Sequence, residues 1–275
     1  MSNGICLVAQ NNKTTDYIKQ AYALALSVLA NSPRTNISLI TNDIVSKKYT
    51  SVFDKIIPIP WGDSAKNNQW KIDNRWKVYH VTPYDNTVVM DVDMLVLDNI
   101  STIWQDFKKS PSLLFTKNVK TYRNELITSR YYRRAFDSNN LPDAYSGVYQ
   151  FSKCDETKTF FVLLDVIMQN WQTFYNKFAP NNKQDWCSVD LSVAIALKIL
   201  DMQGYCLDKS LLTFTHMKPR LQNLDNPPVK WTDALSVDFG DSGLYINGYK
   251  QSGVLHYVED EFLTNNLLVW LEEKV

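Results

Sequence analysis

The chain has 275 residues, 45% of them hydrophobic, which is enough to bury one substantial core. Its 29 Lys and Arg residues balance its 29 Asp and Glu residues, and this balance excludes a global field that would attract nucleic acid or an anionic membrane. Neither a signal peptide nor a run of ~20 apolar residues is visible, and the four cysteines form no Cys-x-x-Cys pair. We therefore predict a soluble cytoplasmic protein with reduced thiols and no membrane span; the sequence indicates no oligomeric state.

The first part of the chain alternates between strand and helix patterns. Strands are predicted over 5–9, 37–40 and 56–59, and helices over 17–29 and 75–81. This order is typical of an α/β fold in which helices flank a mainly parallel central sheet.

The next apolar run, 87–97, contains two carboxylates that are one residue apart, Asp91 and Asp93. Burying unpaired charge costs several kcal/mol, so the run must meet solvent or a cation there. Alternate residues of a strand point the same way, so both carboxylates can converge on one point while Val92 faces the core. Mg²⁺ or Mn²⁺ held by two carboxylates usually completes its coordination with water and phosphate oxygens. The run predicts a metal-bound diphosphate site, and a strand that ends in a solvated acidic turn is the alternative.

Ligands of parallel α/β sheets bind at the edge where the carboxyl ends of the strands meet. The two carboxylates and the loop 10–15, which follows the first predicted strand, should share that edge. The residues expected to contact a ligand there are Ala9, Asn11, Tyr17, Asp91, Val92 and Asp93.

The second half of the chain has fewer clear elements. The segment 120–140 holds four arginines and three tyrosines, and we interpret it as a basic, solvated surface helix or a mobile flap. Proline, asparagine and aspartate are dense over 221–242, which predicts a loop-rich lobe. Further strands or helices are predicted, in chain order, over 145–151, 189–200, 245–258 and 261–271.

The segment RWKVYHVTPYDNTVVMDVDMLVL at 75–97 resembles the family 8 retaining glycosyltransferases, which include glycogenin and bacterial lipopolysaccharide galactosyltransferases. Weaker similarity extends from residue 5 to about residue 257. The resemblance implies a single GT-A-type nucleotide-sugar-binding domain over 1–275, with its nucleotide part over about 1–110 and its acceptor and sugar part over about 111–275. It also implies a nucleotide-sugar donor, by family default a UDP-sugar, bound through Mn²⁺ or Mg²⁺. A hexose would pass to a carbohydrate acceptor with retention at the anomeric carbon.

The resemblance implies roles for several residues at the metal and the diphosphate. Asp91 and Asp93 match the family's metal-binding pair, and His256 matches the histidine that completes the metal shell. His216 is the rival histidine, but the segment 211–216 corresponds to the strand that precedes the family's metal-binding one. The lysine that should follow His256 is missing, so Lys218 and Lys250 are both candidates for the diphosphate contact.

Other residues match positions around the transferred sugar. Arg75 falls where the family places a basic residue near the donor, and the alternative is a helix-surface arginine. Ser146 and Gly147 match a Ser-Gly-Val strand near the sugar, although Tyr145 stands where many members have Asn. Asp190 fits an Asp at the start of a later helix, beside the transferred sugar.

The role of this last carboxylate has open alternatives. Asp185 is a rival for the position of Asp190, and Asp190 could also be a simple helix N-cap. Retention could use a carboxylate nucleophile or front-face attack assisted by the leaving phosphate.

Three other functions share parts of this pattern. A haloacid dehalogenase-type phosphohydrolase would carry Thr or Val where Leu95 stands and would use the first strand of its core. A sugar nucleotidyltransferase would show a Gly-rich loop after the first strand, whereas 10–14 contains no glycine. The alternative that is not an enzyme is a nucleotide-sugar-binding or carbohydrate-binding protein of the same fold.

Overall fold

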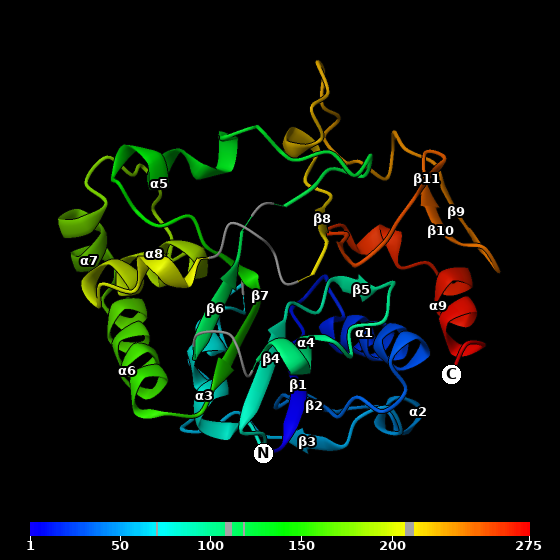
Figure 1. The fold of residues 1–275 in the computed structure, drawn as a ribbon, viewed down its shortest axis with the longest axis horizontal. Coiled ribbons are helices and arrows are strands. Elements are labelled where there is room, and N and C mark those ends of the chain that lie inside the picture. The colour runs from blue at the N-terminus through cyan, green and yellow to red at the C-terminus, as the bar shows by residue number, and fades with distance from the viewer. Residues whose placement is uncertain (70, 108–111, 118, 207–211) are drawn as a thin grey trace.

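A computed structural model describes the chain except for residues 70, 108–111, 118 and 207–211 (Figure 1). Its central sheet has the strand order β3-β2-β1-β4-β7-β6. The first four strands in this order are mutually parallel, whereas β7 runs antiparallel to both β4 and β6. These strands are β1 Asn3–Val8, β2 Ile37–Ile40, β3 Lys55–Ile57, β4 Asn86–Met90, β6 Leu113–Thr116 and β7 Tyr145–Ser152. The predicted α/β fold with a mainly parallel central sheet is thus confirmed.

Helices cover both faces of this sheet (Figure 1). The longer ones are α1 Tyr17–Asn31, α6 Asp155–Gln169, α7 Trp171–Phe178, α8 Val189–Ile199 and α9 Asn265–Glu272. The shorter ones are α2 Lys47–Thr50, α3 Val78–Val81, α4 Ile103–Asp106 and α5 Arg134–Ser138. The 3-10 turns among the described residues lie at Arg75–Lys77, Tyr131–Arg133, Gln203–Tyr205, Pro219–Leu221 and Asp260–Phe262.

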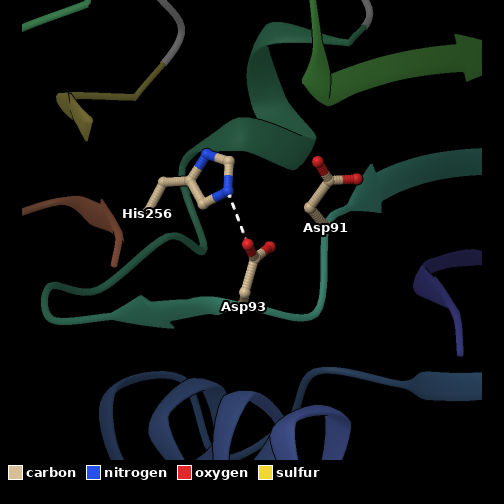
Figure 2. Close-up of side chains that lie close together, drawn as sticks. All are labelled: Asp91, Asp93 and His256. Atoms are coloured by element: carbon tan, nitrogen blue, oxygen red, sulfur yellow. Dashed lines mark hydrogen bonds and ion pairs between the residues drawn. The ribbon is translucent and has the colours of Figure 1, made fainter. Parts of the chain in front are cut away.

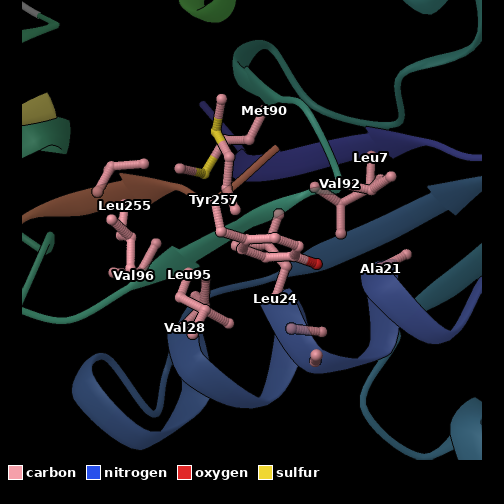
Figure 3. Packing of buried hydrophobic residues seen from close by; sticks show 14 of the residues in the cluster. Leu7, Ala21, Leu24, Val28, Met90, Val92, Leu95, Val96, Leu255 and Tyr257 are labelled. Atoms are coloured by element: carbon pink, nitrogen blue, oxygen red, sulfur yellow. The ribbon is translucent and has the colours of Figure 1, made fainter. Parts of the chain in front are cut away.

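Side-chain alternation along the strands builds a core on each face of the sheet. Leu7 packs into the core beneath α1 and α9, whereas its neighbour Cys6 packs into the core beneath α6 and α8. Figure 3 shows the first core, where Leu24 of α1 lies against the strands. Burying each such side chain stabilises the fold by ~1.5–3 kcal/mol, so the two cores hold the strand ends of this sheet in place.

Within the described ranges, two small sheets accompany the central one. One has the order β5-β12-β8, with β5 Met94–Val96, β12 Val254–His256 and β8 Phe214–His216. The other is antiparallel, with β9 Val237–Gly240, β10 Gly243–Ile246 and β11 Tyr249–Lys250. In the first, β12 pairs antiparallel with β5 in a register that sets His256 opposite Met94. A segment near the C-terminus therefore lies beside the residue that follows Asp93.

Gly253 allows β12 to start where it does. Its φ is +66°, and an added Cβ would lie 2.3 Å from the carbonyl oxygen of Thr213. A side chain at this position would therefore strain the backbone and clash with the backbone of Thr213.

Two local expectations were wrong. The segment 120–140 is no solvated helix: its helical part is limited to the 3-10 turn Tyr131–Arg133 and α5, and Arg133 is buried. The chain also leaves the central sheet at Asp91, so Asp91 and Asp93 do not share one strand face. Burial of the arginine is possible because nearby carboxylates pair with it, which a charge count along the sequence does not show.

Other expectations hold with shifted bounds. The predicted segment 75–81 is a 3-10 turn followed by α3, and 245–258 divides among β10, β11 and β12. Residue 211, where the expected strand 211–216 begins, lies outside the described residues. The four cysteines are free, and no helix among the described residues is long and apolar enough to cross a membrane.

Candidate metal and donor site

The two carboxylates of the Asp-x-Asp motif lie at a bend between two sheets. Strand β4 ends at Met90, and the Asp91 N–H donates to the Gly147 carbonyl at 2.8 Å. The chain then turns, and Asp93 precedes β5. Val92 between them is buried, as predicted. The bend, rather than the alternation of one strand, turns both carboxylates to the same side.

Asp91, Asp93 and His256 form one cluster (Figure 2). One potential ligand atom from each residue lies within 4.8 Å of the others. His256 Nε2 is 2.9 Å from Asp93 Oδ2, whereas the buried Nδ1 has no hydrogen-bond partner among the described residues. Two carboxylates and one imidazole suit a divalent cation such as Mn²⁺ or Mg²⁺, with positions left for other ligands. The donor set therefore fits the predicted metal site.

Charge pairs surround this cluster. Arg75 Nη1 lies 2.5 Å from Asp91 Oδ1. Burial raises the pKa of Asp91 to about 6, and Arg75 opposes this rise. Burial also acts to raise the pKa of Asp93, but His256 and Arg75 outweigh it and hold that pKa below its ordinary value. Asp93 is thus the more readily ionised of the two, and a bound cation would favour the charged form of both.

In the described part of the chain, two large cavities open on the cluster. The first, of about 540 Å³, reaches the carboxyl end of β1, where Val8, Gln10 and Tyr17 line it. The second, of about 360 Å³, runs toward α5 and α8. Residues that line both are Ile72, Arg75, Asp91, Trp186, Lys218 and His256. The cluster therefore lies where the two cavities meet.

Asp190 faces the second cavity and is held by two partners. Its Oδ1 accepts hydrogen bonds from the backbone N–H and the hydroxyl of Ser146, at 2.8 and 2.5 Å. Its Oδ2 lies 3.1 Å from Arg133 Nη1. Burial acts to raise the pKa of Asp190, but Arg133 and Ser146 lower it below the ordinary value, so the carboxylate is charged at neutral pH.

Asp190 is not the N-cap of α8. Ser188 holds that position, and its hydroxyl accepts from the Leu191 N–H. The rival Asp185 is exposed and lines neither of the two cavities within the described structure.

The structure brings most of the predicted residues together, with exceptions at the end of β1. Ala9 is buried and Asn11 accepts a hydrogen bond from the Ile18 N–H; among the described residues, neither lines the two cavities. Gln10 between them lines the first cavity; the loop 10–15 was expected at this edge, but Gln10 was not among the residues expected to contact the donor. It donates to Asp63 and accepts from Asn74. Its position at the strand end was the available signal.

The two lysine candidates are separated clearly. Lys218 lines both cavities, whereas Lys250 is exposed on β11 and lines neither in the described part of the chain. Burial lowers the pKa of Lys218, and Asp190 acts in the opposite direction. Arg133 was also missed, since no local pattern distinguishes it from the other arginines of its segment.

Comparison with known proteins shows similarity at the level of the fold. A scan of protein-family models finds no match, and a search of curated proteins finds none. Among solved structures, the chain resembles galactosyltransferase LgtC in complex with donor and acceptor sugar analogs, with a TM-score of 0.51 at 14% identity. The match covers 98% of this chain and 93% of LgtC. An LgtC active-site mutant matches with a TM-score of 0.50 at 14% identity, over 98% and 95% of the two chains.

A third similar structure is the apo form of the glycosyltransferase GlyE of Streptococcus pneumoniae TIGR4, with a TM-score of 0.45 at 14% identity. That match covers 76% of this chain and 46% of GlyE, so the chain spans about half the length of that protein. The likeness to LgtC, which extends over nearly the whole chain, shows a shared fold, that of the GT-A glycosyltransferases.

Proposed function

We propose that this protein is a metal-dependent, retaining glycosyltransferase related to family 8. It would transfer a hexose from a nucleotide-sugar donor, by family default a UDP-sugar, to a carbohydrate acceptor. The observation that carries the proposal is the Asp91–Asp93–His256 cluster at the junction of two cavities. The fold supports it, because ligands of such sheets bind where these residues lie, at the carboxyl ends of the strands.

The residues of the cluster would hold Mn²⁺ or Mg²⁺, which supplies Lewis-acid stabilisation of negative charge on a departing diphosphate. The first cavity is the larger and suits the nucleotide, with Tyr17 and Gln10 on its wall. Arg75 and Lys218 line both cavities, so their positive charge would lie near the departing diphosphate. Ser146 and Gly147 line only the second cavity, where the sugar would lie.

Asp190 is the candidate for the carboxylate beside the transferred sugar. Ser146 and Arg133 fix its orientation, so it needs little reorganisation when charge develops. In either route to retention, a carboxylate on this wall would stabilise positive charge at the anomeric carbon.

Thermal unfolding with sugar nucleotides tests the proposal. A ligand that binds only the folded protein at 100 times its Kd adds ~2.7 kcal/mol of stability. We expect UDP and at least one UDP-sugar to raise the Tm by several degrees with Mn²⁺ and by little after chelation. Stabilisation without donor hydrolysis or transfer would indicate a non-catalytic binding protein. Pyrophosphate release from a nucleoside triphosphate would indicate a nucleotidyltransferase.

Arg75→Ala should weaken donor use far more than folding. Its guanidinium lies beside Asp91 and both cavities, and a bound metal can replace its neutralisation of that carboxylate. We expect donor turnover to fall at least about tenfold, while the Tm with Mn²⁺ changes little. Arg34→Ala, an exposed control, should change stability by less than ~0.5 kcal/mol and leave turnover intact. Parallel losses of Tm and turnover in Arg75→Ala would assign Arg75 a structural role.

A further inference from the structure

Aromatic side chains are frequent on the wall of the second cavity, and several of these rings have a cation or another ring on one face. The guanidinium carbon of Arg133 lies 3.4 Å from the ring centre of Tyr145 and 4.7 Å from that of Phe136. Lys218 Nζ lies 4.8 Å from the ring centre of Tyr132. Cations therefore cover three of the rings that line this cavity.

The ring of Phe214 is covered as well, because it stacks on His256 with ring centres 6.0 Å apart. Trp186 differs from these residues. It is 51% exposed, and neither an aromatic ring nor a cation covers its indole within the described structure. An indole combines a large apolar face with an N–H donor, so an open one on a cavity wall can bind the apolar face of a ring.

The position of Trp186 adds to this exposure. It lies in the segment between α7 and α8, where its carbonyl accepts a hydrogen bond from Gln184 Nε2 at 2.6 Å. It lines both cavities together with Arg75 and Asp91. An acceptor that attacks the donor sugar must lie where the two cavities meet, and the exposed indole of Trp186 lines that junction.

We propose that the indole of Trp186 is the surface on which the pyranose ring of the acceptor stacks. This inference rests on the proposed function and deepens it, because it assigns the acceptor subsite. Tyr17, which lines only the first cavity, would offer the nucleobase a separate aromatic surface. Trp186 thus selects an acceptor with a C–H-rich ring face and leaves nucleotide binding to other residues.

The test compares Trp186→Ala and Trp186→Phe with the wild type. The probes are methyl α- and β-pyranosides of glucose, galactose, mannose and xylose, titrated by saturation-transfer NMR with UDP and Mn²⁺ present. We expect at least one pyranoside to bind the wild type, about tenfold weaker binding to Trp186→Ala, and recovery of most affinity in Trp186→Phe. UDP affinity should stay within twofold in both variants. Trp61→Ala is the matched control, since Trp61 is 68% exposed and lines neither cavity in the described structure.

Each other outcome is decisive. Unchanged pyranoside affinity in Trp186→Ala, or no pyranoside bound by the wild type, would overturn the assignment. A fall in UDP affinity in Trp186→Ala would show that the indole contacts the nucleotide rather than the acceptor. If the wild type binds no UDP even with Mn²⁺, the proposed function itself fails, and this separates the two failures.

Discussion

Asp93→Asn should abolish metal-dependent UDP binding. The substitution keeps the shape of the side chain but removes the charge of the more readily ionised carboxylate in the cluster. Mutation of residues that merely support metal ligands typically costs 10–100-fold in affinity, so loss of a ligand should cost about 100-fold or more. Calorimetric titration of UDP with Mn²⁺ should show this loss, and chelation of the wild type should reproduce it.

Asp238→Asn is the control for the charge change. Asp238 is exposed on β9 and lines neither cavity among the described residues, so its replacement should leave UDP affinity unchanged. Equal UDP affinity of the wild type with and without Mn²⁺ would refute the metal site. A metal effect that survives in Asp93→Asn would remove only Asp93 from the ligand set.

Asp190→Asn should spare UDP binding and cut turnover. The amide oxygen can still accept from Ser146, but the charge that faces the second cavity and Arg133 is lost. Contacts made mainly in the transition state lower the rate without lowering nucleotide affinity. We expect turnover to fall ~100-fold or more, comparable to removal of a single electrostatic stabiliser, at unchanged UDP affinity.

Asp185→Asn is the matched comparison, since Asp185 is exposed five residues earlier. Its turnover should equal that of the wild type. Normal turnover in Asp190→Asn with a loss in Asp185→Asn would exchange their roles. The anomer of the product, determined by NMR, should retain the configuration of the donor, and an inverted product would refute the relation to family 8.

Local sequence patterns determined much of the fold. Strand β2 was predicted with the bounds that the structure has, and α1 and β7 to within two residues of them. These elements have short-range causes: hydrophobic periodicity and residues that end a strand or helix. The Asp-x-Asp motif could be recognised for the same reason. Two carboxylates within a buried apolar run are costly unless solvent or a cation pairs with them, and the sequence alone shows this.

Tertiary structure decided how the site is assembled. His256 and Asp93 are 163 residues apart, and only the pairing of β12 with β5 brings them together. That pairing depends on the packing of whole strands, which no local pattern reports. The sequence could not predict the antiparallel pairing of β7 with β4 for the same reason.

Among charged residues, tertiary structure also chose between candidates that look alike in the sequence. Lys218 and Lys250 are equivalent candidates in the sequence, yet in the described structure only Lys218 lines the two cavities. Arg133 is one of four arginines in its segment, and its burial follows from the carboxylates of Asp143 and Asp190 that reach it from other segments. The sequence determines which side chains can bind a cation, an anion or a sugar. Which of them meet depends on the long-range packing that sets the free energy of burying their charges.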